Sequence, residues 1–353
     1  MILPKVRRVA TRGADSCIRI AEEPIPVLVA GTVLVEVHAS LVSPGSEVGG
    51  WHGLARRGSD PDPGAERRPF GYSNAGIVLA TGDGVDEWQP GDRVACIGGG
   101  YALHADYAVI PRNLCVSLPV EATFTQGAYA MLLATALHAI RRAQVEFGEF
   151  AAVVGLGLVG QLTAQMLALA GCFVIGWDRI GTRLDIARRC GIDAVVDVGD
   201  EDPIVTSRAF TGEAGLDLGV VAFGGDANDA IRALADSLKV APDTHHMGRI
   251  VVVGGAQFEY PLRASFNVDI RHAGRTGPGY HDEAWEIGPA YPPVFMRWTT
   301  RTNLELCMRL IEAGRLQVDR LTTHAIPFAD AEEGVAELLH DPDAALGVAF
   351  MMR

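Results

Sequence analysis

The 353-residue chain has very little lysine and few cysteines. Lysine occurs only at Lys5 and Lys239, so arginine supplies nearly all of the positive charge and a lysine general base is not expected. The six cysteines are scattered without a CxxC pair, which indicates free thiols in a reducing cytoplasm. The first residues lack the apolar core of a secretory signal peptide, and we therefore expect a cytoplasmic protein.

Basic residues are also outnumbered by acidic ones, 30 to 43, which gives a formal net charge of -13. Such a chain is unsuited to general contacts with a phosphate backbone, so we expect no nucleic-acid partner. The composition is otherwise typical of a globular protein, 48% hydrophobic and 21% charged. The length exceeds that of one ordinary domain, and two domains are expected.

Charged residues are absent from residues 150–177, a stretch long enough for a membrane span of about 20 residues. Gln161, Thr163 and Gln165 lie inside this stretch, however, and its glycines cluster at one end. A buried strand–helix–strand unit explains this pattern better than a membrane span. We therefore expect no membrane association.

The same stretch contains a glycine turn between an apolar run and a segment with helical spacing. A second apolar run ends on Asp178, 18 residues after Gly160, where a dinucleotide-binding unit has an acid about 20 residues on. Gly155 permits a tight turn, Gly157 lets the backbone approach a pyrophosphate, and Gly160 allows close helix packing. A glycine-rich turn in another kind of α/β protein is the alternative. The turn residues expected to bind the cofactor are Gly155, Leu156, Gly157, Leu158, Val159 and Gly160.

The pattern of the chain changes twice. Short alternating strands and glycine or proline turns extend from the start to about residue 121, and a similar mixture returns from about residue 298. Between them, apolar strands alternate with helical segments, as in a doubly wound parallel sheet. We therefore expect an α/β protein in which a nucleotide-binding domain, residues 122–297, is inserted into a β-rich domain formed by residues 1–121 and 298–353.

This order and four motifs resemble the medium-chain dehydrogenase/reductase superfamily, the alcohol dehydrogenase-like fold. The motifs are GDRV at 91–94, HADYAVIP at 104–111, VVGLGLVG at 153–160 and WDRIGTRLDIARRCGIDAV at 177–195. The resemblance covers essentially the full chain and implies a GroES-like catalytic domain with a Rossmann domain. It also implies that Thr135 lies beside the nicotinamide and that Phe223 contacts the cofactor near its adenosine.

The acid at the end of the second strand favours NAD as the cofactor. The Asp178 carboxylate can accept hydrogen bonds from both ribose hydroxyls and would repel a 2′-phosphate. Arg179 and Arg183 are either cofactor residues or a solvated loop edge. The resemblance places Arg183 where NAD-dependent members often carry a basic residue, so it does not by itself indicate NADP.

Zinc-dependent members of the superfamily carry metal ligands at three motif positions that differ in this chain. The resemblance aligns these positions with Pro44, Tyr72 and Met131, which cannot reproduce a cysteine/histidine/cysteine set. The four closely spaced cysteines of the structural zinc lobe are also missing, because the chain between Cys96 and Cys115 is short and contains no further cysteine. We expect no metal at either place; a different ligand set elsewhere is the alternative.

Three further stretches are similar to a zinc-lacking subgroup of the superfamily. They are SPGSE at 43–47, GYSNAG at 71–76 and GPGYHDEAWEIGPAYPPVFMRWT at 277–299. The subgroup includes the dehydrogenase half of bi-domain oxidoreductases and, more distantly, bacteriochlorophyllide dehydrogenases. Its substrates are poorly defined, so the resemblance implies a reaction type rather than a substrate.

Without zinc, protein groups must take the proton from the substrate hydroxyl. The resemblance places Ser46 at the family's proton-relay position. Tyr72 either binds the substrate oxygen or fills the space of the metal, and its reference pKa of about 10 requires a cationic or hydrogen-bonding neighbour before it can act as a base. Glu47 is a general base, a supporting carboxylate or a buried structural acid paired with an arginine.

Other polar residues are weaker candidates. Histidine has the intrinsic pKa of a general base, although a histidine within a helix is more often a packing residue. A polar loop near the end of the second domain would suit a hydroxyl-rich substrate. These candidates are His52, His104, His138, Tyr280, His281 and Asp282.

The predicted function is zinc-independent, NAD-dependent oxidation of a secondary alcohol on a sugar, cyclitol or other polyhydroxylated ring. The first alternative is a reductase of activated C=C bonds or quinones, although these enzymes usually carry an AxxGxxG turn. The second alternative is a non-catalytic dinucleotide-binding redox sensor. By family analogy we expect a homodimer formed through the nucleotide-domain sheet near residues 248–267.

Overall fold

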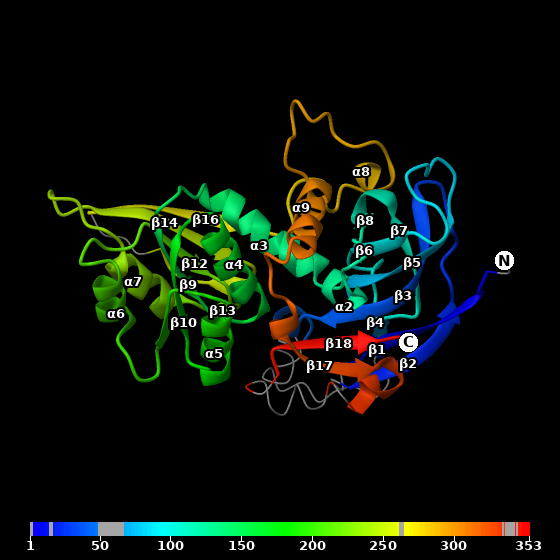
Figure 1. Cartoon of the computed structure of the whole chain (residues 1–353), viewed down its shortest axis with the longest axis horizontal. Coiled ribbons are helices and arrows are strands. Elements are labelled where there is room, and N and C mark those ends of the chain that lie inside the picture. The colour runs from blue at the N-terminus through cyan, green and yellow to red at the C-terminus, as the bar shows by residue number, and fades with distance from the viewer. Residues whose placement is uncertain are drawn as a thin grey trace. The chain divides into compact units, whose positions relative to one another are not determined.

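The computed structural model describes residues 3–13, 17–48, 67–260, 265–333, 335, 343 and 345–353, which Figure 1 colours by position in the chain. The chain divides into two compact units: a first unit of Met1–Ala134 with Thr276–Arg353, and a second unit of Thr135–Arg275. In the described part of the chain, no helix is both long and apolar enough to cross a membrane.

The expected unit boundaries are at residues 121/122 and 297/298, whereas the structure divides the chain at 134/135 and 275/276. Helix α3 (Ala130–Ala143) runs without interruption across the observed boundary at 134/135. Near the second, the hydroxyls of Thr276 and Thr300 are hydrogen-bonded at 2.9 Å, and the Thr276 carbonyl accepts a 2.8 Å hydrogen bond from Asn303 Nδ2. These bonds attach the segment after Arg275 to the first unit.

The described part of the first unit contains two sheets. Their strands are β1 (Val6–Arg12), β2 (Ile18–Pro24), β3 (Thr32–Val42), β4 (Arg68–Pro69), β5 (Ser73–Thr81), β6 (Arg93–Ile97), β7 (Tyr107–Pro111), β8 (Cys115–Ser117), β17 (Thr322–Pro327) and β18 (Gly347–Met351). The larger sheet follows the order β17-β18-β3-β5-β6-β8, with β7 paired to β3, and the smaller follows β2-β1-β4. Strands from both ends of the chain therefore meet in one sheet, as β18 beside β3 shows in Figure 1.

Strand β3 is the centre of the larger sheet. Its sequence TVLVEVHASLV is rich in β-branched residues, which favour strands, and only Glu36 and His38 within it are not buried. Because β3 pairs with β5, β7 and β18, its end is fixed. A single turn of π-helix, η1 (Pro44–Val48), follows and carries Ser46 and Glu47.

The segment between β8 and β9 (Phe150–Val154) forms two helices. A capping box on Thr123 begins α2 (Phe124–Gly127), and the Gln126 N–H donates to the Thr123 hydroxyl at 3.1 Å. Helix α2 ends after one turn, and α3 begins at Ala130. The other helices of the first unit are α8 (Glu283–Ile287), α9 (Thr300–Glu312) and the short turns η2 (Arg112–Leu114), η3 (Asp319–Leu321) and η4 (Phe328–Asp330).

The second unit is built on a parallel sheet. Its strands are β9 (Phe150–Val154), β10 (Phe173–Asp178), β11 (Ala194–Asp197), β12 (Leu218–Val221), β14 (His246–Val253) and β16 (Phe266–Ala273), beside a short pair, β13 (Gly225–Asp226) and β15 (Ala256–Gln257). Its helices are α4 (Leu158–Leu169), α5 (Gly181–Arg189), α6 (Pro203–Phe210) and α7 (Asn228–Ser237).

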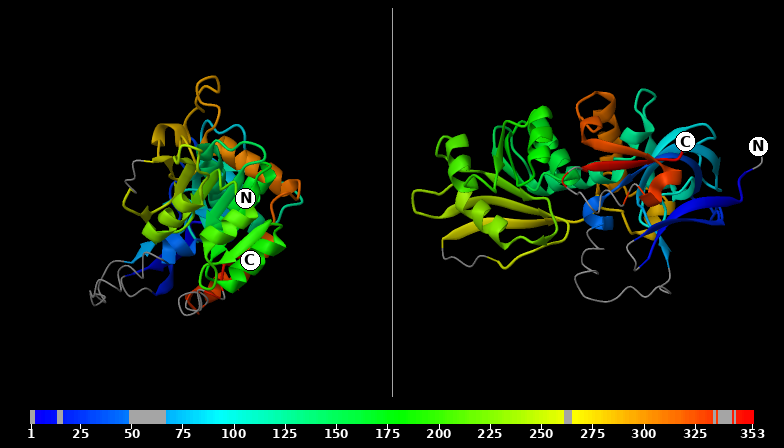
Figure 2. Two further views of the ribbon diagram at one scale, coloured as in Figure 1. Left: turned by 90° about the vertical axis from the view of Figure 1, so that its left-hand side faces the viewer. Right: turned by 90° about the horizontal axis from the view of Figure 1, so that it is seen from below.

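The strand order of this sheet is β11-β10-β9-β12-β14-β16. Apolar clusters cover both of its faces: Leu167 of α4 and Leu184 of α5 belong to one, and Ile231 and Leu234 of α7 belong to the other. The views in Figure 2 show helices on both sides of these strands. Strand order reverses between β9 and β12, and such sheets bind ligands at the carboxyl ends of their strands at this point.

Candidate active site

The glycine turn of the second unit connects β9 to α4. Gly155 has a φ of +88°, a left-handed conformation that favours glycine. A Cβ atom at Gly160 would lie 1.8 Å from the Gly155 carbonyl oxygen, so this position excludes any side chain. At Gly157, by contrast, an added Cβ atom would meet no atom within 4 Å. Two of the three glycines therefore serve the turn itself, and the third leaves open space beside it.

Gly157 is also the N-cap of α4, and no side chain caps this helix end. The N–H groups of the first helical turn consequently point outward without an intrahelical acceptor, as a pyrophosphate site requires. This turn, the space at Gly157 and the acid at the end of β10 fit a dinucleotide.

Asp178 is 7% exposed and binds the glycine turn directly. Its Oδ2 accepts a 2.6 Å hydrogen bond from the Leu156 N–H, and its Oδ1 accepts the N–H groups of Arg179 and Ile180 at 2.8 and 3.0 Å. Arg183 Nη1 lies 3.9 Å from Oδ2. A carboxylate has about four acceptor positions, so these three N–H groups leave one for a ribose hydroxyl rather than the two expected.

The other predicted cofactor residues lie in several elements of the second unit. Phe223 follows β12 and packs against the turn, since a Cβ atom at Gly155 would lie 3.1 Å from its ring. Leu158 and Val159 form the start of α4, Arg179 is exposed, and Thr135 is half-buried in α3.

Gln161 lies in α4 beside the turn, and the sequence analysis did not predict a functional role for it. Its Nε2 donates to the carbonyl oxygens of Leu156 and Arg183, at 3.2 and 2.8 Å. It thereby joins the turn to α5. Its position as a polar residue within an apolar helix was the available signal.

In the first unit, η1 folds back on the end of β3. The Glu47 N–H donates to the Ser43 carbonyl at 2.9 Å, and Glu47 Oε2 accepts the Ser43 N–H at 2.6 Å. Ser46 is exposed on this turn, whereas Glu47 is 4% exposed. Ser46 therefore faces solvent, whereas the adjacent Glu47 faces the interior.

The buried carboxylate meets His104. Glu47 Oε1 lies 3.2 Å from His104 Nε2, and His104 Nδ1 lies 2.8 Å from the hydroxyl oxygen of Ser40. The rings of Phe70 and Phe350 pack edge-on against the imidazole, with centroid distances of 4.8 and 5.1 Å. The carboxylate is thus paired with a histidine.

The expected arginine is nearby but binds elsewhere. Arg12 Nη1 donates at 3.1 Å to the backbone carbonyl of Glu47, not to its side chain. The predicted pairing of the Glu47 carboxylate with an arginine is therefore wrong. His104, one of the weaker candidates from the sequence, takes that place.

Tyr72 lies beside this cluster. The side chains of Ser43 and Ser46 lie beside its phenol. Burial raises the pKa of Tyr72 above its ordinary value, the negative charge of Glu47 raises it further, and the two serine hydroxyls oppose this effect. The neighbours of Tyr72 therefore favour a neutral phenol, which donates a hydrogen bond, over the phenolate that a general base requires.

The backbone around Tyr72 is closely packed. Gly71 has a φ of +116°, and a Cβ atom there would lie 2.4 Å from the backbone nitrogen of His104. The Tyr72 carbonyl accepts the Gly98 N–H at 3.0 Å. The next glycine, Gly99, donates its N–H to the Tyr280 hydroxyl at 2.9 Å. These contacts bring Tyr280 from a distant part of the sequence toward Tyr72.

Several other candidates lie apart from this cluster or are structural. His281 is exposed, and Asp282 caps α8 through the Trp285 N–H. His138 lies in α3, where burial and the adjacent Arg142 lower its pKa. His52 lies outside the described residues.

The three expected metal-ligand positions are now located. Pro44 begins η1, Tyr72 lies beside two serines, and the Met131 N–H donates to the Ser73 hydroxyl at 3.1 Å. Across the described ranges, no group of three or more histidine, cysteine, aspartate or glutamate side chains is arranged to hold a metal ion.

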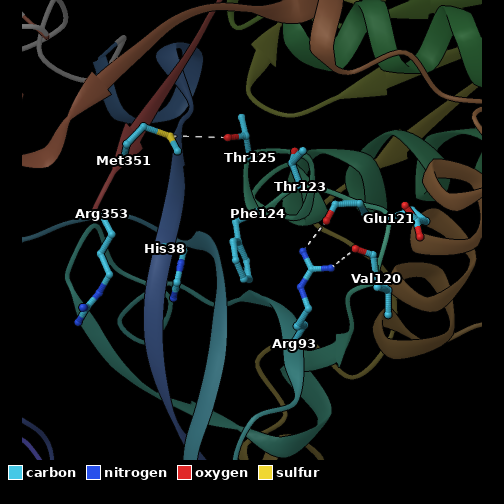
Figure 3. Close-up of a pocket in the computed structure, with 10 residues that line it drawn as sticks. His38, Arg93, Val120, Glu121, Thr123, Phe124, Thr125, Met351 and Arg353 are labelled. Atoms are coloured by element: carbon cyan, nitrogen blue, oxygen red, sulfur yellow. Dashed lines mark hydrogen bonds between the residues drawn. The ribbon is translucent and has the colours of Figure 1, made fainter.

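A separate pocket of about 530 Å³ lies in the first unit and is drawn in Figure 3. Phe124 lies between His38, at a ring-centroid distance of 4.3 Å, and Arg93, whose guanidinium carbon is 4.7 Å from the Phe124 centroid. Arg93 also donates to the carbonyls of Pro119, Val120 and Ala122. This pocket contains none of the predicted site residues, and its arginine fastens the loop that leads into α2.

Two family models match the chain. Residues 29–120 match the alcohol dehydrogenase GroES-like domain, and residues 159–282 match the model described as zinc-binding dehydrogenase. The chain belongs to the medium-chain dehydrogenase/reductase superfamily, the alcohol dehydrogenase-like fold. Both the expected superfamily and the expected fold class, a GroES-like domain with a Rossmann domain, are confirmed.

Sequence relatives of this superfamily member cover most of the chain. D-guloside 3-dehydrogenase of Escherichia coli (strain K12) is 27% identical over 314 residues, 86% of this chain and 84% of the relative. D-xylulose reductase A of Aspergillus niger is 25% identical over 358 residues, 91% of this chain and 90% of the relative.

Solved structures share the fold over nearly the full length. Alcohol dehydrogenase TADH from Thermus sp. ATN1 has a TM-score of 0.77 and 22% identity, and the match covers 98% of this chain and 100% of that one. The alcohol dehydrogenase rspB from E. coli CFT073, solved with NADH, has a TM-score of 0.73 and 17% identity, covering 99% and 100%.

Proposed function

We propose that the chain is a zinc-independent, NAD-dependent dehydrogenase that interconverts a secondary alcohol and a ketone on a sugar, cyclitol or other polyhydroxylated ring. The observation that carries the proposal is the hydroxyl cluster of Tyr72, Ser43 and Ser46 at the place of a metal ligand. Superfamily membership supports oxidoreductase chemistry. The relatives named for guloside and xylulose support a hydroxylated small molecule as the substrate.

The cofactor residues of the second unit have separate tasks in this proposal. The N–H groups at the start of α4 would hold the pyrophosphate, and the Asp178 carboxylate would accept one ribose hydroxyl. The negative charge of Asp178 disfavours a 2′-phosphate, which supports NAD over NADP. The nicotinamide, when bound, accepts a hydride from the alcohol or returns it to the ketone.

The residues of the first unit act on the substrate oxygen. The Tyr72 phenol binds this oxygen and donates a hydrogen bond to it, and the exposed hydroxyl of Ser46 exchanges protons with solvent. A hydrogen-bond donor of this kind stabilises negative charge that develops on the oxygen during hydride transfer. Tyr72 therefore supplies part of what zinc supplies in the metal-dependent enzymes.

The catalytic assignment is tested with Tyr72→Phe and Ser46→Ala under steady-state turnover. We expect Tyr72→Phe to lower kcat/KM roughly a hundredfold or more, the usual contribution of a positioned acid or base, and Ser46→Ala to lower it less. Tyr107→Phe is the matched control, because its phenol binds Arg353 at 3.2 Å within the same unit. Equal turnover in Tyr72→Phe and wild type would remove Tyr72 from the proposal.

The cofactor assignment is tested separately by fluorescence titration with NADH and NADPH. Asp178→Asn keeps one acceptor oxygen for the turn but loses the charge. We expect NADH binding to weaken about tenfold or more, and the ratio of the affinity for NADH to the affinity for NADPH to decrease. Unchanged binding of both cofactors would contradict the assignment of Asp178.

A homodimer in the cytoplasm remains part of the proposal. Strand β16 is an eight-residue edge of the parallel sheet, paired with β14 on one side in the described part of the chain. Pairing of β16 with the β16 strand of a second copy, about a two-fold axis, would cover the unpaired side of β16 in both copies. Light scattering coupled to size exclusion should give twice the 37.5 kDa mass of the chain.

A further inference from the structure

Two buried cysteines of the first unit form a close pair. Cys96 lies on β6 and Cys115 on β8, the two neighbouring strands labelled in Figure 1. Their sulfur atoms are 3.6 Å apart, both residues are 0% exposed, and neither is part of a disulfide. The proposed function leaves this pair without a task.

The strand register gives the pair the backbone spacing of a disulfide. Cys96 is opposite Cys115 in the antiparallel ladder of β6 and β8, where opposite residues alternate between hydrogen-bonded and non-hydrogen-bonded pairs. The Leu118 N–H donates to the Arg93 carbonyl at 2.9 Å, which makes these two a hydrogen-bonded pair. Along the register, Cys96 and Cys115 are therefore a non-hydrogen-bonded pair. The Cα atoms of such a pair are about 4.5 Å apart, within the range of about 4.4–6.8 Å that disulfides span.

The sulfur atoms are the only atoms that must move far for a bond to form. Their separation of 3.6 Å has to shorten to the length of a disulfide bond, about 2.05 Å. Because the backbone spacing already suits a disulfide, rotation about the two Cα–Cβ bonds can achieve this without displacing either strand. The pair is thus preorganised for oxidation.

The position of β8 decides how an oxidant reaches the buried pair. This strand has three residues and is the last in the order of the larger sheet. In the described part of the chain it is hydrogen-bonded to β6 alone, and helix α9 packs against it. A short edge strand of this kind opens locally at lower free energy than the centre of a sheet. Local opening therefore exposes Cys115 first.

Cys96 is the more protected of the two thiols. It lies on β6, between β5 and β8, so opening of the edge leaves one side of its strand paired. Burial raises the pKa of the Cys96 thiol, and the neighbouring Cys115 raises it further. We therefore expect Cys115 to react first and Cys96 to react with the oxidised Cys115.

We propose that Cys96 and Cys115 are a redox-active pair that a hydroperoxide converts into a cross-strand disulfide, and that this bond fixes the edge strand β8 on β6. In a reducing environment the pair stays as two thiols. Strand β6 leads directly to Gly98, whose N–H donates to the Tyr72 carbonyl at 3.0 Å, so the bond lies next to the backbone of the candidate site. The proposal does not depend on the proposed function.

Two electrons and two protons leave the pair in this reaction. The Cys115 thiolate attacks one oxygen of hydrogen peroxide, the O–O bond breaks, and the other oxygen leaves as water with the proton of the thiol. Cys115 is then a sulfenic acid. The Cys96 thiolate attacks the Cys115 sulfur, the S–O bond breaks, and the hydroxyl leaves as water with the Cys96 proton. In sum, two thiols and one peroxide give one disulfide and two molecules of water.

The bond is tested on the purified, natively folded full chain treated with hydrogen peroxide. All proteins carry Cys17→Ser, because an exposed thiol can link two copies. We expect a mass lower by two hydrogen atoms, a peptide that joins Cys96 to Cys115 in a non-reducing digest, and recovery of both thiols with dithiothreitol. Thiols that stay free, or addition of three oxygen atoms to either one, would overturn the proposal.

Single variants test the order of the two steps. Cys96→Ser leaves the oxidised Cys115 without a second thiol, so dimedone should label its sulfenic acid. Cys115→Ser leaves the protected Cys96, which should be labelled about tenfold more slowly or less. Cys172→Ser, at a buried cysteine of the second unit, is the matched control and should still form the disulfide. Equal labelling of the first two variants would overturn the assignment of Cys115 as the first thiol; if a serine variant does not fold, the peptide map of the parent protein still decides whether the bond forms.

Hydrogen exchange tests the effect of the bond on the sheet edge. In the oxidised protein, the backbone amides of β8 should exchange severalfold more slowly than in the reduced protein, because the disulfide opposes their local opening. The strands of the second unit should exchange alike in both forms. Unchanged exchange of β8 in protein shown to contain the disulfide would overturn the claim that the bond fixes this edge.

Discussion

Gly157 and Gly160 lie three residues apart but are glycines for different physical reasons. A side chain at Gly160 would strike the backbone of the turn, whereas one at Gly157 would enter open space. The first constraint comes from the fold of the protein. The second comes from a molecule that must approach the backbone.

This difference predicts opposite outcomes for two similar substitutions. Gly160→Ala should reduce the free energy of unfolding by about 1–3 kcal/mol, the usual cost of an overpacked site. Gly157→Ala should leave stability within about 0.5 kcal/mol of the wild type but weaken NADH binding tenfold or more. Both variants are measured by thermal unfolding and by NADH titration. If the two substitutions changed stability and NADH binding to the same extent, the separate roles of the two glycines would be contradicted.

His38 predicts a dependence of stability on pH. Burial lowers its pKa below the ordinary value of 6.5, although Glu36 opposes the shift. As the pH falls below 6.5, the unfolded chain therefore binds a proton that the folded chain resists, and the free energy of unfolding decreases. Denaturant unfolding at pH 7.5 and 5.5 should show a smaller decrease for His38→Gln than for the wild type. His281→Gln, at an exposed residue, is the control and should behave as the wild type does.

At the scale of single elements, local sequence patterns predicted the strands well. The apolar run before the glycine turn is β9, and the second apolar run, which ends on Asp178, is β10. The division into α2 and α3 was not predicted, because the capping box at Thr123 closes one short turn before α3 begins. Caps and breaks of this kind depend on contacts that periodicity does not contain.

Helix α9 provides a test of local capping. The Thr299 hydroxyl accepts the Thr302 N–H at 3.2 Å, and the Thr302 hydroxyl accepts the Thr299 N–H at 2.8 Å. Thr299→Ala should therefore cost about 1 kcal/mol of unfolding free energy, measured in denaturant. Thr299→Ser, which keeps the accepting oxygen, should retain most of the stability. No difference between the two variants would mean that the cap does not stabilise α9.

At the scale of the whole molecule, the candidate site depends on contacts that are distant in the sequence. His104 and Glu47 are 57 residues apart, and Tyr280 meets Gly99 across 181 residues. The motif positions of Ser46, Glu47 and Tyr72 could be found from a family resemblance. Their partners could not, because strand pairing and the π-helical turn bring Ser40, Ser43 and His104 to them. The chemistry of Tyr72 follows from those partners.

The same argument applies to the dinucleotide turn. Spacing alone located Gly155, Gly160 and Asp178, since one strand–helix–strand unit is local in the sequence. The sequence did not reveal that the Asp178 carboxylate already accepts three backbone N–H groups. That finding reduces its proposed contact with ribose to one hydrogen bond.

The measurement that tests the central claim most directly is NADH formation from NAD by purified protein that has been stripped with a strong chelator and analysed for bound metal. The substrates are a panel of cyclitols, hexoses and sugar alcohols, assayed with the chelator still present. The account predicts turnover of at least one of these compounds by metal-free protein, at the same rate before and after stripping. Turnover that disappears with the chelator and returns with added zinc would contradict it, as would NADH binding without turnover of any compound in the panel.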